Sequence, residues 1–121
     1  THGHAAGDSV LREIARRSCE CLRKADLLAR VGGEEFAVIL PETGKEGACI
    51  QAERIRDSFC SKAFCCPDGS VAVTASFGVA SLSETESADA KELAGKADEA
   101  LYKAKKTGRN RICCFENFSC I

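Results

Sequence analysis

The chain has 121 residues and a formal net charge of -1, with 45% hydrophobic and 29% charged residues. This length suits one domain with a core of its own. The near-neutral charge favours neither a nucleic-acid partner nor an anionic membrane surface. No apolar run approaches the length of a membrane span, and no signal-peptide pattern opens the chain. Because it starts at Thr1 and contains no methionine, we expect a fragment of a longer protein.

The first expected element is a helix over about residues 8–24, followed by two strands. In the helix, apolar and small residues recur at spacings of three and four. They form one face, and charged residues, Arg17 among them, fill the other. The strands, 26–31 and 36–40, are predicted to form a hairpin. The second strand is apolar on both faces, which is typical of a central, covered strand.

The second half of the chain predicts two further helices and two further strands. A capping-box pattern, Thr43 followed by Glu46, opens a helix whose buried stripe is Ala48, Ala52, Ile55 and Phe59. A turn at 67–69 leads into a strand over 71–79, and a polar loop spans 83–87. A helix over about 89–105, a C-terminal cap at Gly108 and a strand over 111–115 complete the order. We therefore expect a single α+β domain over residues 1–121, with helices on a mostly antiparallel sheet.

Nine cysteines are an unusual feature of this composition. The number is odd, and the paired cysteines 65–66 and 113–114 would point to opposite strand faces, where they make poor joint ligands. We expect most of these thiols to be small, buried and reduced, which indicates a reducing cytosol. A metal or redox site is the alternative.

Residues 32–36, Gly-Gly-Glu-Glu-Phe, lie between the two predicted hairpin strands. Two glycines allow a sharp bend and the close approach of another molecule. The adjacent carboxylates of Glu34 and Glu35 can hold a divalent cation and accept a proton. This combination suits chemistry on a nucleotide phosphate, and the alternative is a solvated hairpin turn.

Five segments together resemble the GGDEF domain of diguanylate cyclases, in its GGEEF variant. Beside residues 32–36 these are 1–8 (similar to GHxxGD), 23–26 (RxxD), 76–80 (Ser-Phe-Gly-Val-Ala) and 97–105 (ADxALYxAK), with 108–110 reading Gly-Arg-Asn. The resemblance covers residues 1 to about 115. It implies a ferredoxin-like, palm-type nucleotide-binding fold. It also implies condensation of two GTP molecules into cyclic di-GMP with release of pyrophosphate, in a homodimer that brings two domains face to face.

The resemblance also implies roles for residues of the substrate site. Glu34 is similar to the family's metal ligand and proton acceptor, for Mg²⁺ or Mn²⁺, and Glu35 supports the metal site or the fold. Gly32 and Gly33 let the phosphates approach, or serve the turn alone. Asp8 matches the aspartate that reads guanine, and a helix-terminal acid is the alternative. Lys105 and Arg109 resemble a triphosphate grip, although cations are favoured at a helix C-terminus in any case.

A second implied site binds the product, cyclic di-GMP, and inhibits the enzyme. Arg23 and Asp26 form its RxxD motif, and Arg54 matches a further arginine. The alternative for Arg23 and Asp26 is a helix-end salt bridge of little energetic weight. Two other functions therefore compete with catalysis: an inactive module that binds cyclic di-GMP or GTP, and a structural fragment without a ligand.

The family pattern begins upstream of Thr1, with a central strand that carries a metal-binding aspartate. Glu34 by itself is a poor Mg²⁺ site, since this cation needs several oxygen ligands. We therefore expect the first strand and the start of the first helix to be missing, and this chain alone to be inactive. In the parent protein we expect an upstream sensor domain and a cytoplasmic location in bacteria, with or without a tether to a membrane sensor.

Overall fold

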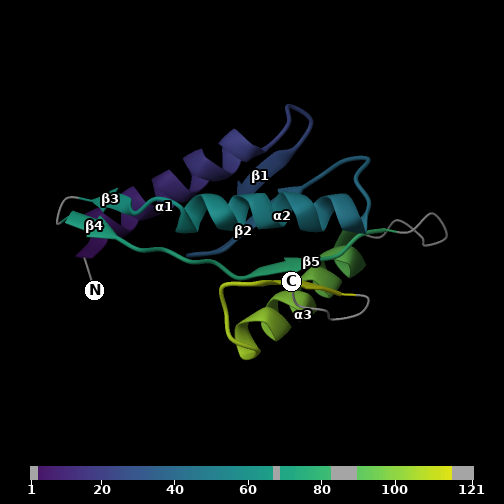
Figure 1. Ribbon diagram of the computed structural model, residues 1–121. Coiled ribbons are helices and arrows are strands. Elements are labelled where there is room, and N and C mark those ends of the chain that lie inside the picture. The colour runs from purple at the N-terminus through teal and green to yellow at the C-terminus, as the bar shows by residue number, and fades with distance from the viewer. Residues whose placement is uncertain (1–2, 67–68, 83–89, 116–121) are drawn as a thin grey trace. The chain divides into compact units, whose positions relative to one another are not determined.

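The computed structural model describes residues 3–66, 69–82 and 90–115. The chain divides into two compact units, and Figure 1 shows the helices and strands that they contain. The first comprises Thr1–Pro41 and Asp57–Thr74, and the second comprises Glu42–Arg56 and Ala75–Ile121. The predicted loop at 83–87 and part of the predicted turn, residues 67–68, lie outside the described residues.

The first unit contains a helix and two antiparallel hairpins. Helix α1 spans Gly3–Cys21, and strands β1 (Leu27–Arg30) and β2 (Phe36–Ile39) form the predicted hairpin. Strands β3 (Phe64–Cys66) and β4 (Gly69–Val71) form a second hairpin. Helix α1 packs against β1 and β3, and Figure 1 shows its purple ribbon beside the β3–β4 hairpin.

A buried arginine organises the core of the first unit. Arg17 is only 6% exposed, and Phe59 and Phe64 beside it are 4% and 0% exposed. The two rings meet edge to face with centroids 5.9 Å apart, a favoured geometry for aromatic pairs. The sequence-based prediction that Arg17 lies on the exposed face of its helix is therefore wrong. Its charge is balanced by Glu13, one turn earlier on α1, at 2.8 Å.

Helix α2 spans Lys45–Cys60 and confirms its predicted stripe. The four stripe residues are all buried, at 8% exposure or less: Ala48, Ala52, Ile55 and Phe59. Their spacing of three and four residues places them on one helix face, and burial of that face stabilises a helix of this length.

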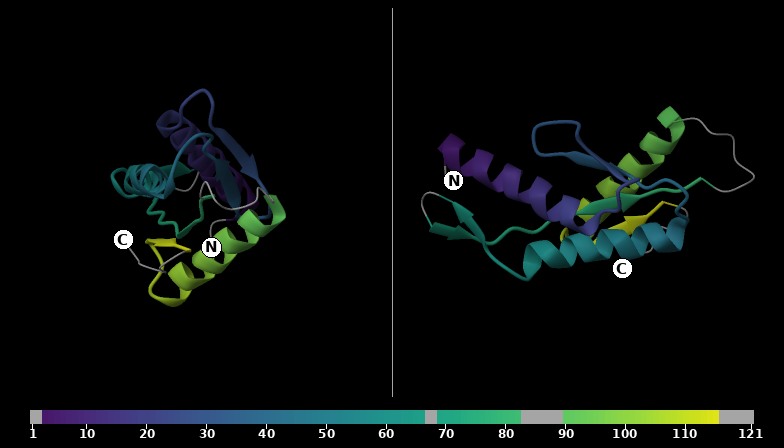
Figure 2. Two further views of the ribbon diagram at one scale, coloured as in Figure 1. Left: turned by 90° about the vertical axis from the view of Figure 1, so that its right-hand side faces the viewer. Right: turned by 90° about the horizontal axis from the view of Figure 1, so that it is seen from above.

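The second unit is built on a parallel strand pair and a helix. Strand β5 (Phe77–Val79) pairs with β6 (Ile112–Cys114), with Gly78 opposite Cys113. Helix α3 spans Ala90–Lys106 and packs along both strands (Figures 1 and 2). A parallel pair needs such a crossover helix. Three fully buried residues of this unit, Ala100, Ala104 and Cys113, form a core cluster, and Phe115 packs against it.

Gly78 explains why α3 lies so close to β5. A Cβ atom at this position would lie 2.7 Å from Leu101 Cα and would also clash with Ala97 O and Leu101 N. The strand backbone therefore rests directly on the helix backbone, which no residue with a side chain permits. Close packing against α3 thus explains the glycine in the Ser-Phe-Gly-Val-Ala segment.

Several predicted elements differ from the structure. The strand predicted over 71–79 is two short strands, because Val71 pairs in the β3–β4 hairpin and β5 begins only at Phe77. Strand β2 pairs with β1 alone among the described strands, and Ile39 is 57% exposed. The prediction of a central strand covered on both faces is therefore wrong for β2. An apolar run cannot by itself distinguish a central strand from an edge strand, since the pairing partners lie elsewhere in the chain.

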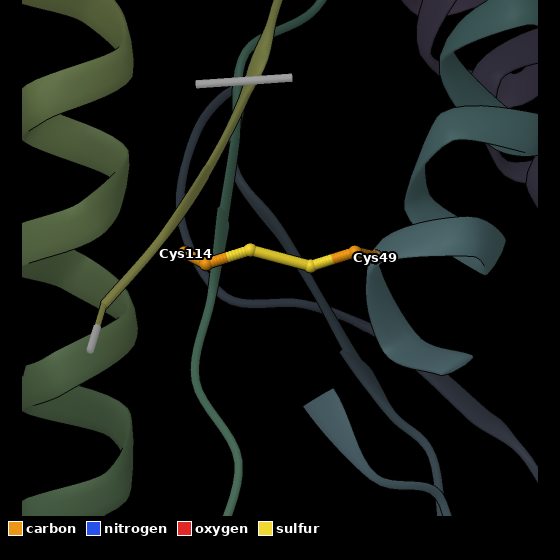
Figure 3. Close-up of a disulfide and its surroundings, with 2 residues drawn as sticks. All are labelled: Cys49 and Cys114. Carbon is orange, nitrogen blue, oxygen red and sulfur yellow. A yellow bond between two sulfur atoms is a disulfide. The ribbon is translucent and has the colours of Figure 1, made fainter. Parts of the chain in front are cut away.

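The cysteines also depart from the prediction of reduced thiols. Figure 3 shows a disulfide between Cys49 on α2 and Cys114 on β6. Both residues are buried, as is Cys113, whereas Cys19 is an exposed free thiol and Cys60 is exposed. The expected burial is thus right for these three cysteines, and the expected reduced state is wrong for all three, because Cys113 is disulfide-bonded too. Sequence could not reveal this pairing, because 65 positions separate its members.

Within the described ranges, none of the helices is long and apolar enough to cross a membrane.

Candidate active site

The Gly-Gly-Glu-Glu segment forms the turn of the β1–β2 hairpin. The turn is closed by hydrogen bonds from Val31 N and Gly32 N to Glu35 O, at 2.9 and 3.4 Å. The side chains of Glu34 and Glu35 are both exposed. Two carboxylates therefore stand at the end of a hairpin, where a ligand from solvent can reach them.

The two glycines are not needed by the turn itself. Neither Gly32 nor Gly33 lies in the left-handed region, and a Cβ at Gly33 would meet no atom within 4 Å. At Gly32 the nearest atoms to such a Cβ, both of Glu35, are at 3.8 Å, an ordinary contact. What the glycines provide is bare backbone beside two carboxylates, which favours close approach by another molecule.

Arg30 holds this turn from the end of β1. Its Nε donates to Gly32 O at 3.2 Å and to Gly33 O at 3.1 Å. Charge-assisted bonds of this kind fix the carbonyl directions more firmly than neutral ones. Sequence reasoning missed this residue, although its position two residues before the glycine pair is a usable signal.

Asp8 lies on α1, away from the first helical turn. The helix begins at Gly3, and its first turn contains no acidic residue. Because the helix dipole acts mainly within the first turn, it gives little reason for an acid at this position. The Asp8 side chain is exposed, which leaves it accessible to a ligand.

Arg23 and Asp26 of the RxxD motif contact each other directly. Arg23 Nη2 lies 2.9 Å from Asp26 Oδ1, and the main-chain N–H of Arg23 donates to Asp26 Oδ2 at 2.8 Å. The hydrogen bond from the Arg23 guanidinium holds the pKa of Asp26 below its usual range. The Asp26 side chain is fully covered, whereas that of Arg23 is 58% exposed and also donates to Pro41 O. The arginine, held in place by the aspartate, is thus the part of the pair that solvent reaches.

Lys105 and Arg109 occupy the C-terminal end of α3, in the second unit. The last turn of this helix carries three lysines, Lys103, Lys105 and Lys106. Lys106 Nζ also lies 5.3 Å from the ring centroid of Tyr102. Arg109 follows in the cap and is exposed. Lys105 and Arg109 therefore lie at one helix end that carries several cations.

The helix cap around Arg109 has an unusual backbone. Gly108, Arg109 and Asn110 have φ angles of 134°, 61° and 45° in succession. The N–H of Arg109 donates to Ala104 O at 2.9 Å, the bond of a glycine-terminated helix. A non-glycine residue in this region costs about 1–2 kcal/mol, and less for asparagine. Contacts around the cap offset this conformational free-energy cost at Arg109.

The predicted site residues thus fall into groups. The hairpin turn brings together Gly32, Gly33, Glu34 and Glu35, and Arg23 contacts Asp26, all in the first unit. Lys105 and Arg109 share one helix end in the second unit. Arg54 belongs to this second unit too, on the exposed face of α2, where its Nη1 donates to Gln51 Oε1 at 3.2 Å.

Comparison with known protein families gives one match that covers most of the chain. Residues 1–111 match the family described as "Diguanylate cyclase, GGDEF domain". Diguanylate cyclase A from Treponema denticola is 46% identical over 118 residues, which are 97% of this chain and 31% of that protein. The chain spans about a third or less of the length of the curated relatives it matches.

Solved structures agree with this family. The active GGEEF domain of a diguanylate cyclase from Vibrio cholerae has a TM-score of 0.84 and 36% identity, covering 94% of this chain and 71% of that one. The GGDEF domain of DgcB from Caulobacter crescentus, in complex with c-di-GMP, has a TM-score of 0.85 and 33% identity, covering 94% and 67%. These similarities confirm the α+β cyclase fold expected from the sequence.

Proposed function

Since the chain belongs to the GGDEF family of diguanylate cyclase domains, we propose that it condenses two GTP molecules into cyclic di-GMP. The observation that carries this proposal is the hairpin turn, where the exposed carboxylates of Glu34 and Glu35 adjoin bare glycine backbone. A nucleotide phosphate approaching that backbone would lie beside a proton acceptor. The cations at the end of α3 suit the same kind of substrate.

The reaction consists of two equivalent displacements. In each, the 3′-oxygen of one GTP forms a bond to the α-phosphorus of the other, and the bond to the leaving pyrophosphate breaks. Glu34 takes the proton of the attacking 3′-hydroxyl. Lys105 and Arg109 hold the polyphosphate, and Asp8 selects guanine by accepting hydrogen bonds from its ring N–H and amino group. Since each domain would hold one nucleotide, catalysis needs a homodimer.

A divalent cation, Mg²⁺ or Mn²⁺, fits the chemistry of this turn. Mg²⁺ is usually held by one or two carboxylates together with substrate phosphates and water, and Glu34, supported by Glu35, offers such oxygens. When bound, the cation supplies neutralisation of phosphate charge. In the part of the chain that the structure describes, no group of three or more His, Cys, Asp or Glu side chains could hold a metal ion. With so few ligands, we expect the 121-residue chain assayed alone to be inactive.

Product inhibition is the second part of the proposal. An arginine can bind a phosphate or a guanine edge with two parallel hydrogen bonds. Arg23 is exposed and oriented by Asp26, which supports a site for cyclic di-GMP there, with Arg54 as a further contact. The parent protein would carry its sensor domain upstream and place this domain in the bacterial cytoplasm.

The same Arg23–Asp26 pair supports a second candidate function, a module that binds cyclic di-GMP or GTP without turnover. The two functions differ in what Glu34 does. In a cyclase, Glu34→Gln removes the proton acceptor and one charge from the metal site, and leaves the inhibitory site unchanged. In a binding module there is no turnover for the substitution to lower, and binding of cyclic di-GMP stays unchanged.

The experiment measures GTP turnover and cyclic di-GMP binding with the longer parent protein in Mg²⁺ buffer. For a cyclase, Glu34→Gln lowers turnover by about 100-fold or more and leaves calorimetric binding of cyclic di-GMP intact. Arg23→Ala does the reverse, since it weakens cyclic di-GMP binding and relieves inhibition. A wild-type parent that binds cyclic di-GMP and forms none from GTP would establish the binding module instead.

A further inference from the structure

Arg56 on α2 contacts the strained cap that carries Arg109. Its Nη1 donates to Asn110 Oδ1 at 3.1 Å, across 54 positions of sequence. Both residues belong to the second unit. The Arg56 side chain is 21% exposed, so it sits largely beneath the surface. This is a long-range contact to the residue directly after a proposed phosphate-binding arginine.

Glu53, one turn earlier on α2, fixes the orientation of the Arg56 guanidinium. Arg56 Nε donates to Glu53 Oε1 at 2.8 Å, and Nη2 donates to the same oxygen. Because Nε and Nη2 both donate to Glu53, Nη1 is directed away from that carboxylate and donates to Asn110 Oδ1. Because Glu53 neutralises Arg56, the pair adds no net positive charge that would itself attract a phosphate.

Hydrogen bonds hold both the N–H and the carbonyl oxygen of Arg109. Ala104 O accepts its N–H at 2.9 Å, and Arg111 Nε donates to its carbonyl oxygen at 3.1 Å. Asn110 comes next, in the left-handed region, with its amide oxygen bound to Arg56. The Cys49–Cys114 disulfide also ties α2 to the strand that follows this cap. The Arg109 backbone is thus held by its own helix and loop, and Arg56 of α2 adds a contact from another element at the next residue, Asn110.

We propose that Arg56 is a positioning residue, which holds Arg109 in place for the nucleotide polyphosphate by binding Asn110. The inference rests on the proposed function, in which Lys105 and Arg109 bind that polyphosphate. Arg56 itself does not contact the nucleotide. A small displacement of a positioning group costs a large factor in affinity or rate, because the hydrogen bonds depend on alignment. Loss of Arg56 should therefore weaken the interaction with the outer phosphates specifically.

The test compares two probes that cannot condense, 3′-deoxyguanosine triphosphate and 3′-deoxyguanosine monophosphate. Both lack the attacking hydroxyl, and only the first carries the β- and γ-phosphates. Affinities are measured by calorimetry in Mg²⁺ buffer with the longer parent protein. In the wild type we expect the triphosphate to bind more tightly than the monophosphate, and Arg109→Ala to remove that advantage.

We expect Arg56→Ala to reduce the triphosphate advantage by about ten-fold and to leave monophosphate affinity unchanged. Asn110→Ala should give the same loss, and the double variant no further loss, because both substitutions break one contact. Arg56→Lys keeps a donor and should restore part of the advantage. Arg16→Ala, on the exposed face of α1, is the matched control and should change neither affinity.

The outcomes separate the inference from the proposed function. If Arg109→Ala removes the advantage and folded Arg56→Ala and Asn110→Ala keep it, the positioning role is wrong and the function stands. If the wild type shows no triphosphate advantage, both are wrong. A general folding defect would lower both probe affinities and cyclic di-GMP binding together. In that event Asn110→Ala decides: loss of the triphosphate advantage alone supports the role, and its retention overturns it.

Discussion

The guanidinium carbon of Arg17 lies 3.8 Å from the centroid of the Phe64 ring, so a charged group stacks on the most buried aromatic residue of the first unit. The same guanidinium donates to three main-chain oxygens, those of Ser58, Lys62 and Ala63, at 3.0, 2.7 and 3.1 Å. These carbonyls lie at or just beyond the end of α2, where no helical N–H can reach them. One arginine thus caps a helix, neutralises Glu13 and covers a ring.

We expect Arg17→Ala to lower the free energy of unfolding by about 3 kcal/mol, because it leaves buried carbonyls and the Glu13 carboxylate without their donor. Urea denaturation at neutral pH measures the change. The control is Arg16→Ala at the next position, which is exposed and should change stability by no more than about 0.5 kcal/mol. Equal losses in the two variants would contradict a special role for Arg17.

The contact of Gly78 with the α3 backbone predicts a strong effect of a single methyl group. Gly78→Ala should destabilise the chain by about 2 kcal/mol or more, since the added Cβ overlaps backbone atoms that cannot rotate away. Gly95→Ala, within α3 where a Cβ would meet nothing, should instead stabilise it by about 0.5–1 kcal/mol. Thermal unfolding of both variants checks the opposite signs. A Gly78→Ala protein as stable as the wild type would refute the close packing.

Glu13 should make the stability depend on pH under acidic conditions. Hydrogen bonds from Arg16 and then Arg17 lower its pKa from 4.5 to about 2. A lowered pKa means that the folded state favours the carboxylate, so this stabilisation is complete above about pH 4.5 and is lost as the pH falls towards about 2. Denaturation midpoints across this range should fall less steeply for Glu13→Gln than for the wild type. Parallel curves would exclude the Glu13 contribution.

The Cys49–Cys114 disulfide predicts a redox-dependent stability. Its loss by Cys49→Ser should cost about 2–4 kcal/mol, because the bond closes a long loop in the unfolded chain. Cys19→Ser is the control, since that thiol is exposed and free, and it should have little effect. Alkylation followed by mass spectrometry reports the state directly. Reaction of Cys49 and Cys114 with the reagent without prior reduction would show that the pair is not bonded.

Local patterns in the sequence predicted the helices and the β1–β2 hairpin well. Apolar spacing depends only on the helical period, and for this reason the stripe from Ala48 to Phe59 is buried as predicted. The hairpin could be recognised because glycines separate two apolar runs. The family motifs also identified Glu34, Arg23 and Arg109 as candidates, whose roles as site residues stay predictions.

Tertiary structure decided what depends on contacts between distant positions. Nothing near Arg17 in the sequence shows that its charge would be buried, because its main-chain partners lie more than 40 positions away. The disulfide and the contact from Arg56 to Asn110 likewise join segments whose pairing no local pattern encodes. Because motif and period are local properties, the sequence alone identifies the candidate residues for the chemistry. The fold decided which of them are held in place, because burial and hydrogen bonding depend on the whole packed chain.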